Sequence, residues 1–219
     1  MTKLEICAHV DHTALKAFTT WEDVRKLCEE ALKYRFASVC IPPCYVKRVK
    51  EAYGDKVVVC TVIGFPLGYE VTPAKAAEAS RAAADGADEI DMVINVADVK
   101  NGDFGKVREE IEQIRTTTKG KVLKVIVETC YLSEEEKIKL CEIVTQTGVD
   151  YIKTSTGFGT AGAALEDVKL FKRRIGPAVK IKAAGGIRTF EDMERYIAEG
   201  CERIGTSSAA NLLEEEESR

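Results

Sequence analysis

Eight short apolar segments rich in β-branched residues alternate with longer amphipathic segments along all 219 residues of the chain. We expect strands at 8–11, 37–41, 57–63, 89–94, 122–128, 150–155, 179–184 and 203–207. We expect helices at 21–34, 43–53, 73–85, 103–116, 134–147, 163–175, 190–199 and 208–216. Strands that alternate with helices are typical of a parallel sheet in an α/β protein. Eight such units predict that residues 1–219 form a single (β/α)8 barrel, a TIM barrel, rather than an open doubly wound sheet.

Residues typical of helix ends support these ranges. Thr20, Ser133 and Thr189 stand where N-caps are expected, and Ser133 with Glu136 matches a capping box. Pro73 suits the first position of a helix. Glycines follow four of the helical segments and precede strands, as C-terminal glycines do, at Gly86, Gly148, Gly176 and Gly200.

The composition excludes several classes of protein. With 45% hydrophobic residues and a formal net charge of −4, the chain is neither disordered nor rich in cationic segments that bind nucleic acid. No apolar run is long enough to span a membrane. The N-terminal segment lacks the pattern of a signal peptide. We therefore expect a cytoplasmic protein with neither a membrane nor a nucleic acid as partner.

Cysteine and histidine usage argues against disulfides and metal. The eight cysteines are scattered through apolar segments, which indicates reduced, mostly buried thiols: Cys7, Cys28, Cys40, Cys44, Cys60, Cys130, Cys141 and Cys201. The only histidines, His9 and His12, have opposite parity on a strand, so they do not share one face. We expect no metal site.

A weak internal repeat identifies residues that face the barrel interior. The segments GADEIDMV, GVDYIKTS and GCERIGTS align Asp91, Lys153 and Gly205, and FASVCIPP places Cys40 at the same level. If the isoleucine of each segment faces the helices, the following residue faces the interior, because side chains alternate along a strand. Charged groups there are costly unless paired, and active sites of barrels lie at the carboxyl ends of the strands.

Two lysines on neighbouring predicted strands suggest Schiff-base chemistry. Lys153 and Lys182 would lie close together, and two charges about 4 Å apart at an effective dielectric near 20 repel by roughly 4 kcal/mol, or about 3 pK units. Such repulsion would leave one amine neutral near pH 7.5, as a nucleophilic lysine requires. Lys180 shares the parity of Lys182, so parity alone does not choose between them. The alternative is that these lysines form structural ion pairs with Asp91, Glu128 or Asp11.

The acidic residues near these lysines have candidate roles. Asp91 suits proton transfer beside a lysine. Asp11 ends the first strand, next to the eighth in a closed barrel, and could either join a water-linked relay or cap the segment that follows it. Lys124 and Glu128 share one parity on the fifth strand, and we interpret them as supporting interior polar residues.

Glycine-bearing loops after the last two strands suggest a phosphate site. Gly185 and Gly186 follow the seventh strand, and Gly205 precedes Ser207 and Ser208 after the eighth. In many barrels these loops offer backbone N–H groups to a phosphate. The alternative is that the glycines serve only as turns. Arg188 lies close by and could either assist the phosphate site or face solvent.

The segment 157–162 matches the dinucleotide-binding pattern G-x-G-x-x-G. A dinucleotide site would have an acidic residue about 20 positions later, where this chain has Lys182. We therefore expect a substrate loop and no cofactor.

Several motifs together closely resemble the deoxyribose-phosphate aldolase family. They are VDHTALK, SVCIPP, ADEIDMVIN, LKVIVETC, YIKTSTGF, KAAGGIRT and RIGTSSA, and they extend from Val10 to about Ala209. The family consists of class I aldolases on (β/α)8 barrels. The resemblance implies the same fold and a metal-independent reaction without a cofactor.

The resemblance also implies roles for individual residues. The Schiff-base lysine is Lys153, the second lysine is Lys182 rather than Lys180, and the aspartate of the proton relay is Asp91, supported by Asp11. The phosphate contacts map to Gly157, Gly185, Gly186, Gly205, Ser207 and Ser208. Cys40 matches a cysteine that lines the substrate pocket in some relatives.

The implied reaction is the reversible cleavage of 2-deoxy-D-ribose 5-phosphate to D-glyceraldehyde 3-phosphate and acetaldehyde, in deoxyribonucleoside catabolism. A homodimer or higher homo-oligomer is implied as well. The chain departs from some relatives in ending EEEESR, without a tyrosine tail that reaches the site, and in having Ala17 where a proline is usual. The rival hypotheses are a barrel Schiff-base lyase or isomerase for a different sugar phosphate, and a catalytically silent phosphate-binding protein.

Overall fold

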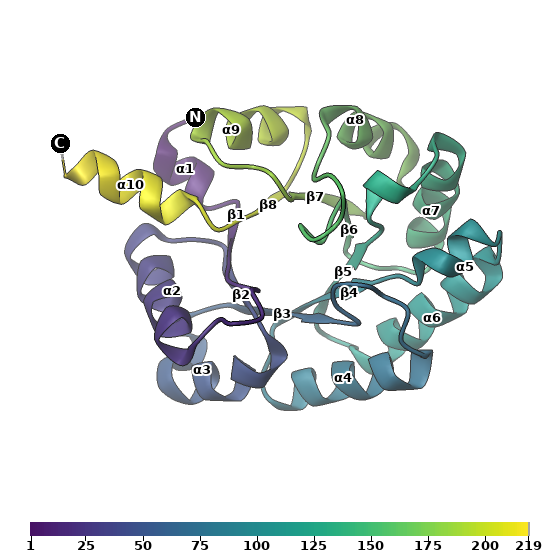
Figure 1. Cartoon of the computed structure of the whole chain (residues 1–219), viewed down its shortest axis with the longest axis horizontal. Coiled ribbons are helices and arrows are strands. Elements are labelled where there is room, and N and C mark those ends of the chain that lie inside the picture. Colours follow the sequence, from purple (N-terminus) through teal and green to yellow (C-terminus); the bar gives the residue numbers. More distant parts are fainter. Residues whose placement is uncertain (219) are drawn as a thin grey trace.

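The computed structural model describes residues 1–218, in which eight parallel strands close into a barrel (Figure 1). The strands are β1 (Val10–Thr13), β2 (Ser38–Ile41), β3 (Val59–Ile63), β4 (Glu89–Val93), β5 (Val122–Ile126), β6 (Tyr151–Lys153), β7 (Lys180–Ala184) and β8 (Arg203–Thr206). Each pairs with its neighbour in sequence, and β8 closes on β1 with Val10 opposite Ile204. The predicted (β/α)8 barrel is confirmed, with every predicted strand present.

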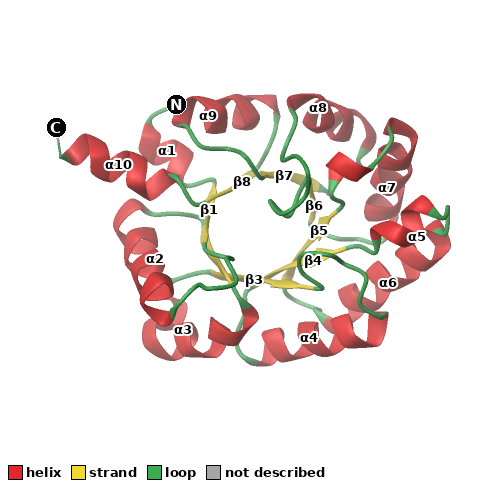
Figure 2. Cartoon of the chain, viewed as in Figure 1, coloured by secondary structure: helices red, strands yellow, loops and turns green. Residues whose placement is uncertain are grey.

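Helices form a ring outside the barrel (Figure 2). They are α2 (Trp21–Tyr34), α3 (Val46–Tyr53), α4 (Thr72–Ala84), α6 (Phe104–Thr117), α7 (Glu134–Gln146), α8 (Leu165–Arg174), α9 (Phe190–Glu199) and α10 (Ala209–Glu217). Two five-residue helices, α1 (Lys3–Cys7) and α5 (Val96–Lys100), were not predicted, because one helical turn carries little periodicity. Single 3-10 turns are η1 (Pro43–Tyr45), η2 (Gly54–Lys56) and η3 (Thr129–Tyr131). Among the helices of residues 1–218, none combines the length and apolarity needed to cross a membrane.

The predicted helix ends are largely confirmed. The hydroxyls of Thr20, Ser133 and Thr189 each accept a backbone N–H three residues further on, and the capping box at Ser133 is complete. Pro73 stands at the second position of α4 rather than the first, because the helix begins at Thr72. Gly176 is not a left-handed C-terminal glycine like the other three; its N–H donates to the hydroxyl of Thr145 at 2.9 Å.

The main apolar core lies between the barrel and the helices. Ile90, Ile152 and Ile204 are fully buried in it, so the residue after each faces inward, as the internal repeat predicts. All eight cysteines are free, and Cys44 alone is exposed among them. The prediction that the thiols are mostly buried is confirmed.

A buried ion pair lies outside the barrel, between α4 and α6. The ammonium of Lys75 lies 2.9 Å from a carboxylate oxygen of Glu110 and donates to the carbonyl of Val93 at 2.9 Å. Burial raises the pKa of Glu110, against the attraction of Lys75. The backbone of Gly64 packs so closely that a Cβ there would lie 2.8 Å from Cε of Lys75. The pair therefore fixes the carboxyl ends of β3 and β4 next to the barrel mouth.

Candidate active site

A network of charged side chains occupies the barrel interior, with Asp91 at its centre. Lys153 and Lys182 donate to its Oδ2 at 2.8 and 2.7 Å, and Lys124 donates to its Oδ1 at 2.9 Å. Register explains the convergence: Asp91 pairs with Lys124 across β4 and β5, and Lys153 with Lys182 across β6 and β7. The structure therefore brings together Asp91, Lys153 and Lys182, and Lys124 lies in the interior beside them, as the interpretation of it as a supporting polar residue predicts.

Asp11 joins this network rather than capping the segment that follows β1. Its Oδ2 lies 2.5 Å from the ammonium of Lys182, and its Oδ1 lies 2.6 Å from the guanidinium of Arg203. The hydroxyl of Ser38, its partner in the β1–β2 register, donates to the same Oδ1 at 2.8 Å. Asp11 is therefore placed where a relay residue was expected.

The pKa of Lys182 is not lowered by its proximity to Lys153. Burial disfavours its ammonium, but Asp11 and Asp91 outweigh burial and raise the pKa of Lys182. The same balance holds the pKa of Asp91 well below its usual range, because three lysines outweigh its burial. The repulsion argument considered two cations only, whereas Lys182 also contacts the carboxylates of Asp11 and Asp91.

Lys153 is the interior amine with the most access to the barrel mouth. Its side chain is 4% exposed and has one carboxylate partner, Asp91. The side chain of Lys182 is fully buried and contacts two carboxylates, and Lys124 is equally buried among three. A nucleophilic amine must reach a substrate and lose its proton, so Lys153 suits that role and Lys182 does not.

The remaining candidates on these strands lie elsewhere. Lys180 is exposed, with its ammonium 3.7 Å from the carboxylate of Glu202, so Lys182 is the interior lysine of β7. Glu128 is buried but does not contact the lysines. It has a left-handed backbone (φ 54°), and its carboxylate accepts hydrogen bonds from the hydroxyl and N–H of Thr156. Glu128 therefore supports the loop after β6.

Cys40 lies in a small apolar cluster beside the network, together with Cys60 and Val62 and with Leu15 and Phe65 packed on it. A hydrogen bond with Cys60, helped by Lys182 and Lys153, lowers the pKa of Cys40 against its burial. The sulfurs of Cys40 and Cys60 and a carboxylate oxygen of Asp91 lie within 4.8 Å of one another, as metal ligands do. The ammonium groups on Asp91 oppose a cation there.

The histidines lie outside the network. The Nε2 of His12 is 2.6 Å from Glu30 of α2, and the Nδ1 of His9 is 2.9 Å from the carbonyl oxygen of Glu202. They contact different partners, as their opposite parity predicts.

The glycine-bearing loops converge at the carboxyl ends of β6, β7 and β8. Gly157, Gly185 and Gly186 have positive φ angles of 87°, 87° and 78°, and a Cβ on Gly185 would lie 3.4 Å from Cα of Gly157. The loop after β6 turns in toward the centre of the ring (Figures 1 and 2). Helix α8 begins only at Leu165, so segment 157–162 is an irregular loop rather than the tight strand-to-helix turn of a dinucleotide site.

Gly205 and the two serines predicted as phosphate contacts lie in different surroundings. Gly205 lies within β8, where a Cβ would be 2.9 Å from Cβ of Ala184 and 3.3 Å from Cε of Lys182, so this glycine makes room for the Lys182 side chain. Ser207 and Ser208 precede α10, and the N–H of Ser208 donates to the hydroxyl of Thr206 at 3.1 Å. The phosphate roles of these residues stay a prediction.

A family model described as DeoC/LacD family aldolase matches residues 6–212. The chain belongs to this family. It is 59% identical to a deoxyribose-phosphate aldolase of Clostridium botulinum (strain Alaska E43 / Type E3), over 100% of this chain and 99% of that protein. A deoxyribose-phosphate aldolase of Clostridioides difficile (strain 630) is 57% identical over 95% of each chain.

Solved structures agree with this family. An aldolase named QR15 is 40% identical with a TM-score of 0.92, covering 98% of this chain and 97% of its own. The deoxyribose phosphate aldolase from Aeropyrum pernix, described as a unique tetrameric structure, is 32% identical with a TM-score of 0.91, covering 99% and 93%.

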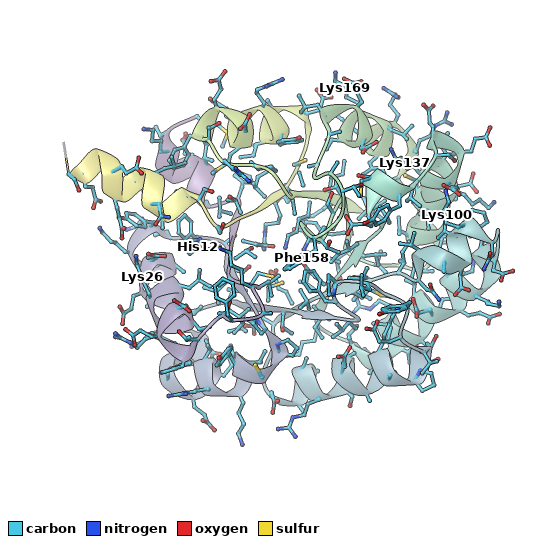
Figure 3. All side chains as sticks on the ribbon, viewed as in Figure 1. His12, Lys26, Lys100, Lys137, Phe158 and Lys169 are labelled. Atoms are coloured by element: carbon cyan, nitrogen blue, oxygen red, sulfur yellow. The ribbon has the colours of Figure 1, made fainter. Side chains whose placement is uncertain are left out.

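Two aromatic residues at the mouth of this family member were not anticipated. Phe158 lies near the centre of the ring in Figure 3 and is 54% exposed. Its ring meets that of Phe65 edge to face at 5.4 Å between centroids. A cavity of about 60 Å³ beside them is lined by Val93, Glu128 and Thr156 among others. A phenylalanine between two glycines in a loop has no periodicity, so the sequence gives no signal for this position.

We expect Gly162→Ala to disturb the predicted phosphate loops. A Cβ at Gly162 would lie 2.1 Å from the carbonyl oxygen of Gly185, so the two loops must separate. KM for a sugar phosphate should rise by roughly tenfold, with a smaller change in kcat, because the loops bind the substrate far from the reacting bond. Steady-state kinetics on purified protein measures both. The control is Gly105→Ala in α6, where a Cβ meets nothing within 4 Å; an equal rise in KM there would contradict the argument.

Proposed function

We propose that this chain catalyses the reversible cleavage of 2-deoxy-D-ribose 5-phosphate to D-glyceraldehyde 3-phosphate and acetaldehyde through a Schiff base on Lys153. The observation that carries the proposal is the placement of one accessible amine on a buried network of Asp91 and Lys182, next to glycine-bearing loops. The family and the printed names of the relatives support the reaction and a sugar phosphate substrate.

The first chemical step is attack of the Lys153 amine on the C1 aldehyde of the open-chain sugar. Loss of water from the carbinolamine gives an iminium ion. Lys153 suits this step because it has one carboxylate partner, whereas Lys182 is held protonated by Asp11 and Asp91.

The second step breaks the C2–C3 bond, with the iminium ion accepting the electron pair. Asp91, acting through water and with Lys182, takes the proton of the C3 hydroxyl, and D-glyceraldehyde 3-phosphate leaves. Protonation of the enamine at C2 and hydrolysis of the imine then release acetaldehyde. Because the pKa of Asp91 lies well below its usual range, its carboxylate is ionised when the C2–C3 bond breaks. The proton that it accepts through water is returned to C2 of the enamine, which restores the carboxylate.

The phosphate end of the substrate is assigned to the convergent loops, with Gly157, Gly185, Gly186, Gly205, Ser207 and Ser208 as the predicted contacts. Left-handed glycines allow a backbone N–H to approach an anion closely. Binding energy gained there orients C1 against Lys153. Cys40, beside Asp91, is assigned to the wall of the pocket.

Borohydride trapping tests the proposal. Incubation with 2-deoxy-D-ribose 5-phosphate and borohydride should fix a mass adduct, and peptide mapping should place it on Lys153, because reduction converts the imine to a stable amine. Absence of an adduct would contradict the imine mechanism. Faster turnover of a different sugar phosphate would favour another lyase, and binding without turnover would favour a silent phosphate-binding protein.

We further infer a single-domain enzyme that acts in the cytoplasm in deoxyribonucleoside catabolism and forms a homo-oligomer. The relative from Aeropyrum pernix is described as tetrameric, which supports self-association here. Sedimentation equilibrium at several concentrations measures the number of copies, and a monomer at all of them would contradict this inference.

A further inference from the structure

We propose that Arg203 and Glu89, at the end of the barrel opposite the mouth, are positioning residues that orient Asp91 and set the charge acting on Lys153. This inference rests on the proposed function of Lys153 as the nucleophile. Neither residue was singled out in the sequence, and neither contacts Lys153 directly. They act through two chains of contacts that end on the two oxygens of one carboxylate.

Arg203 and Glu89 form a bidentate ion pair across the barrel. The two terminal nitrogens of Arg203 lie 3.1 and 2.9 Å from the two carboxylate oxygens of Glu89. The Arg203 side chain is 17% exposed and that of Glu89 is 5% exposed, so the pair closes this end of the barrel. The planar guanidinium fixes the carboxylate at both oxygens, and a lysine could not do so.

One chain of contacts runs through Lys124. Its ammonium lies 2.5 Å from Oε2 of Glu89 and donates to Oδ1 of Asp91 at 2.9 Å. The other chain runs from Arg203 through Asp11 to Lys182, with ion-pair distances of 2.6 and 2.5 Å, and reaches Oδ2 of Asp91 at 2.7 Å. Lys124 therefore binds Oδ1 of Asp91 and Lys182 binds Oδ2, both from the end of the barrel opposite the mouth. These two contacts orient the carboxylate so that Oδ2 also faces the ammonium of Lys153.

The same residues leave the network one positive charge in excess. Its cations are Lys124, Lys153, Lys182 and Arg203, and its anions are Asp11, Glu89 and Asp91. Each cation except Lys153 contacts at least two carboxylates. Lys153 is therefore the cation of the network with the fewest carboxylate contacts, so the charge of the residues below it is the least compensated there.

Other titratable groups near Lys153 do not reverse this argument. Cys60 of β3 lies against Asp91, and burial raises the pKa of its thiol, so it stays neutral. The Tyr151 ring lies beside Arg203, and burial likewise raises its pKa. Glu128, after β5, is held by Thr156 outside the network. Cys40 of β2 has a lowered pKa and could carry a compensating charge, so the experiment includes a Cys40→Ala background.

The test measures the apparent pKa of Lys153 directly. Each variant is labelled with limiting acetic anhydride across a pH series, and peptide mass spectrometry quantifies acetylation of Lys153. Arg203→Met removes a positive charge and should raise the apparent pKa, whereas Glu89→Gln removes a negative charge and should lower it. Each shift should be on the order of one unit at an effective dielectric near 20. The double variant restores the net charge and should return the value close to that of the unaltered chain.

Three comparisons separate positioning from a structural role. Lys180→Met, which removes an exposed cation from the same end of the barrel, should leave the apparent pKa unchanged. Arg203→Lys keeps the positive charge but removes the planar guanidinium that contacts both carboxylate oxygens of Glu89. It should lower kcat several-fold, because Asp91 is then less well oriented, and leave KM and the apparent pKa of Lys153 unchanged. Thermal unfolding checks that each variant is folded, and Arg203→Gln replaces Arg203→Met if that variant is not.

Shifts of the same sign in Arg203→Met and Glu89→Gln, or no shift in either, would overturn the inference, and so would opposite shifts that vanish in the Cys40→Ala background. Because labelling needs no substrate, this readout is independent of cleavage. Opposite shifts in a protein that fails to cleave 2-deoxy-D-ribose 5-phosphate would uphold the charge argument and contradict the proposed function. Cleavage of that substrate without the pKa shifts would uphold the proposed function and contradict the charge argument.

Discussion

Lys153→Met is expected to reduce kcat for cleavage of 2-deoxy-D-ribose 5-phosphate by on the order of 10⁴-fold or more and to abolish the borohydride adduct. The reason is that the imine accepts the electron pair of the C2–C3 bond, and no other amine of the network reaches the mouth. Lys182 and Lys124 are fully buried and stay bound to carboxylates. Steady-state kinetics and the mass of the trapped protein measure the two effects.

The fold should survive this substitution. Methionine has a similar length, and loss of the Lys153 charge removes the positive excess of the network while Lys124 and Lys182 still pair with Asp91. The thermal midpoint should therefore change little. The matched control is Lys182→Met, which should slow turnover but keep an adduct on Lys153. An adduct that persists in Lys153→Met and is lost in Lys182→Met would reverse the assignment.

The fold and the centre of the site could be predicted because both depend on periodicity. Alternating apolar and amphipathic segments determine the barrel, and the two-residue repeat of a strand directs Asp91 and Lys153 to the interior. Parity also includes Glu89 and Arg203, which stand two positions before Asp91 and Gly205. Parity alone does not identify them as interior residues, because a charged residue at the start of a strand is usually solvent-exposed.

The rest depends on distances that a sequence does not contain. The sequence argument from repulsion between Lys153 and Lys182 does not include Asp91, which contacts both lysines, or Asp11, which contacts Lys182, because only the closed barrel shows these contacts. The choice between Lys182 and Lys180 needs the depth of each residue in the barrel, which parity does not give. The contact of Phe158 with Phe65 joins two irregular loops, whose paths depend on turns and packing rather than on periodicity.

Asp91→Asn is expected both to inactivate the protein and to destabilise it. The kcat should fall by about 10²- to 10⁴-fold, the usual contribution of a positioned acid–base group. The free energy of unfolding at pH 7 should fall by roughly 3–5 kcal/mol, because a neutral amide leaves three buried ammonium groups without their shared carboxylate. Urea unfolding followed by circular dichroism measures the second effect. Asp55→Asn, at a fully exposed carboxylate, is the control and should change neither quantity.

The destabilisation should depend on pH with a definite sign. The lysines hold the pKa of Asp91 well below its usual range, so its carboxylate stabilises the fold at every pH above the unfolded value near 3.9. This stabilisation is lost as the pH falls below that value toward the lower pKa of the folded state. The difference in unfolding free energy between the unaltered chain and Asp91→Asn should therefore be constant from pH 7 to about 5 and should shrink below pH 4. A difference that grows on acidification would mean that Asp91 is protonated in the folded protein, and the ion-pair network would then not be what holds the barrel interior together.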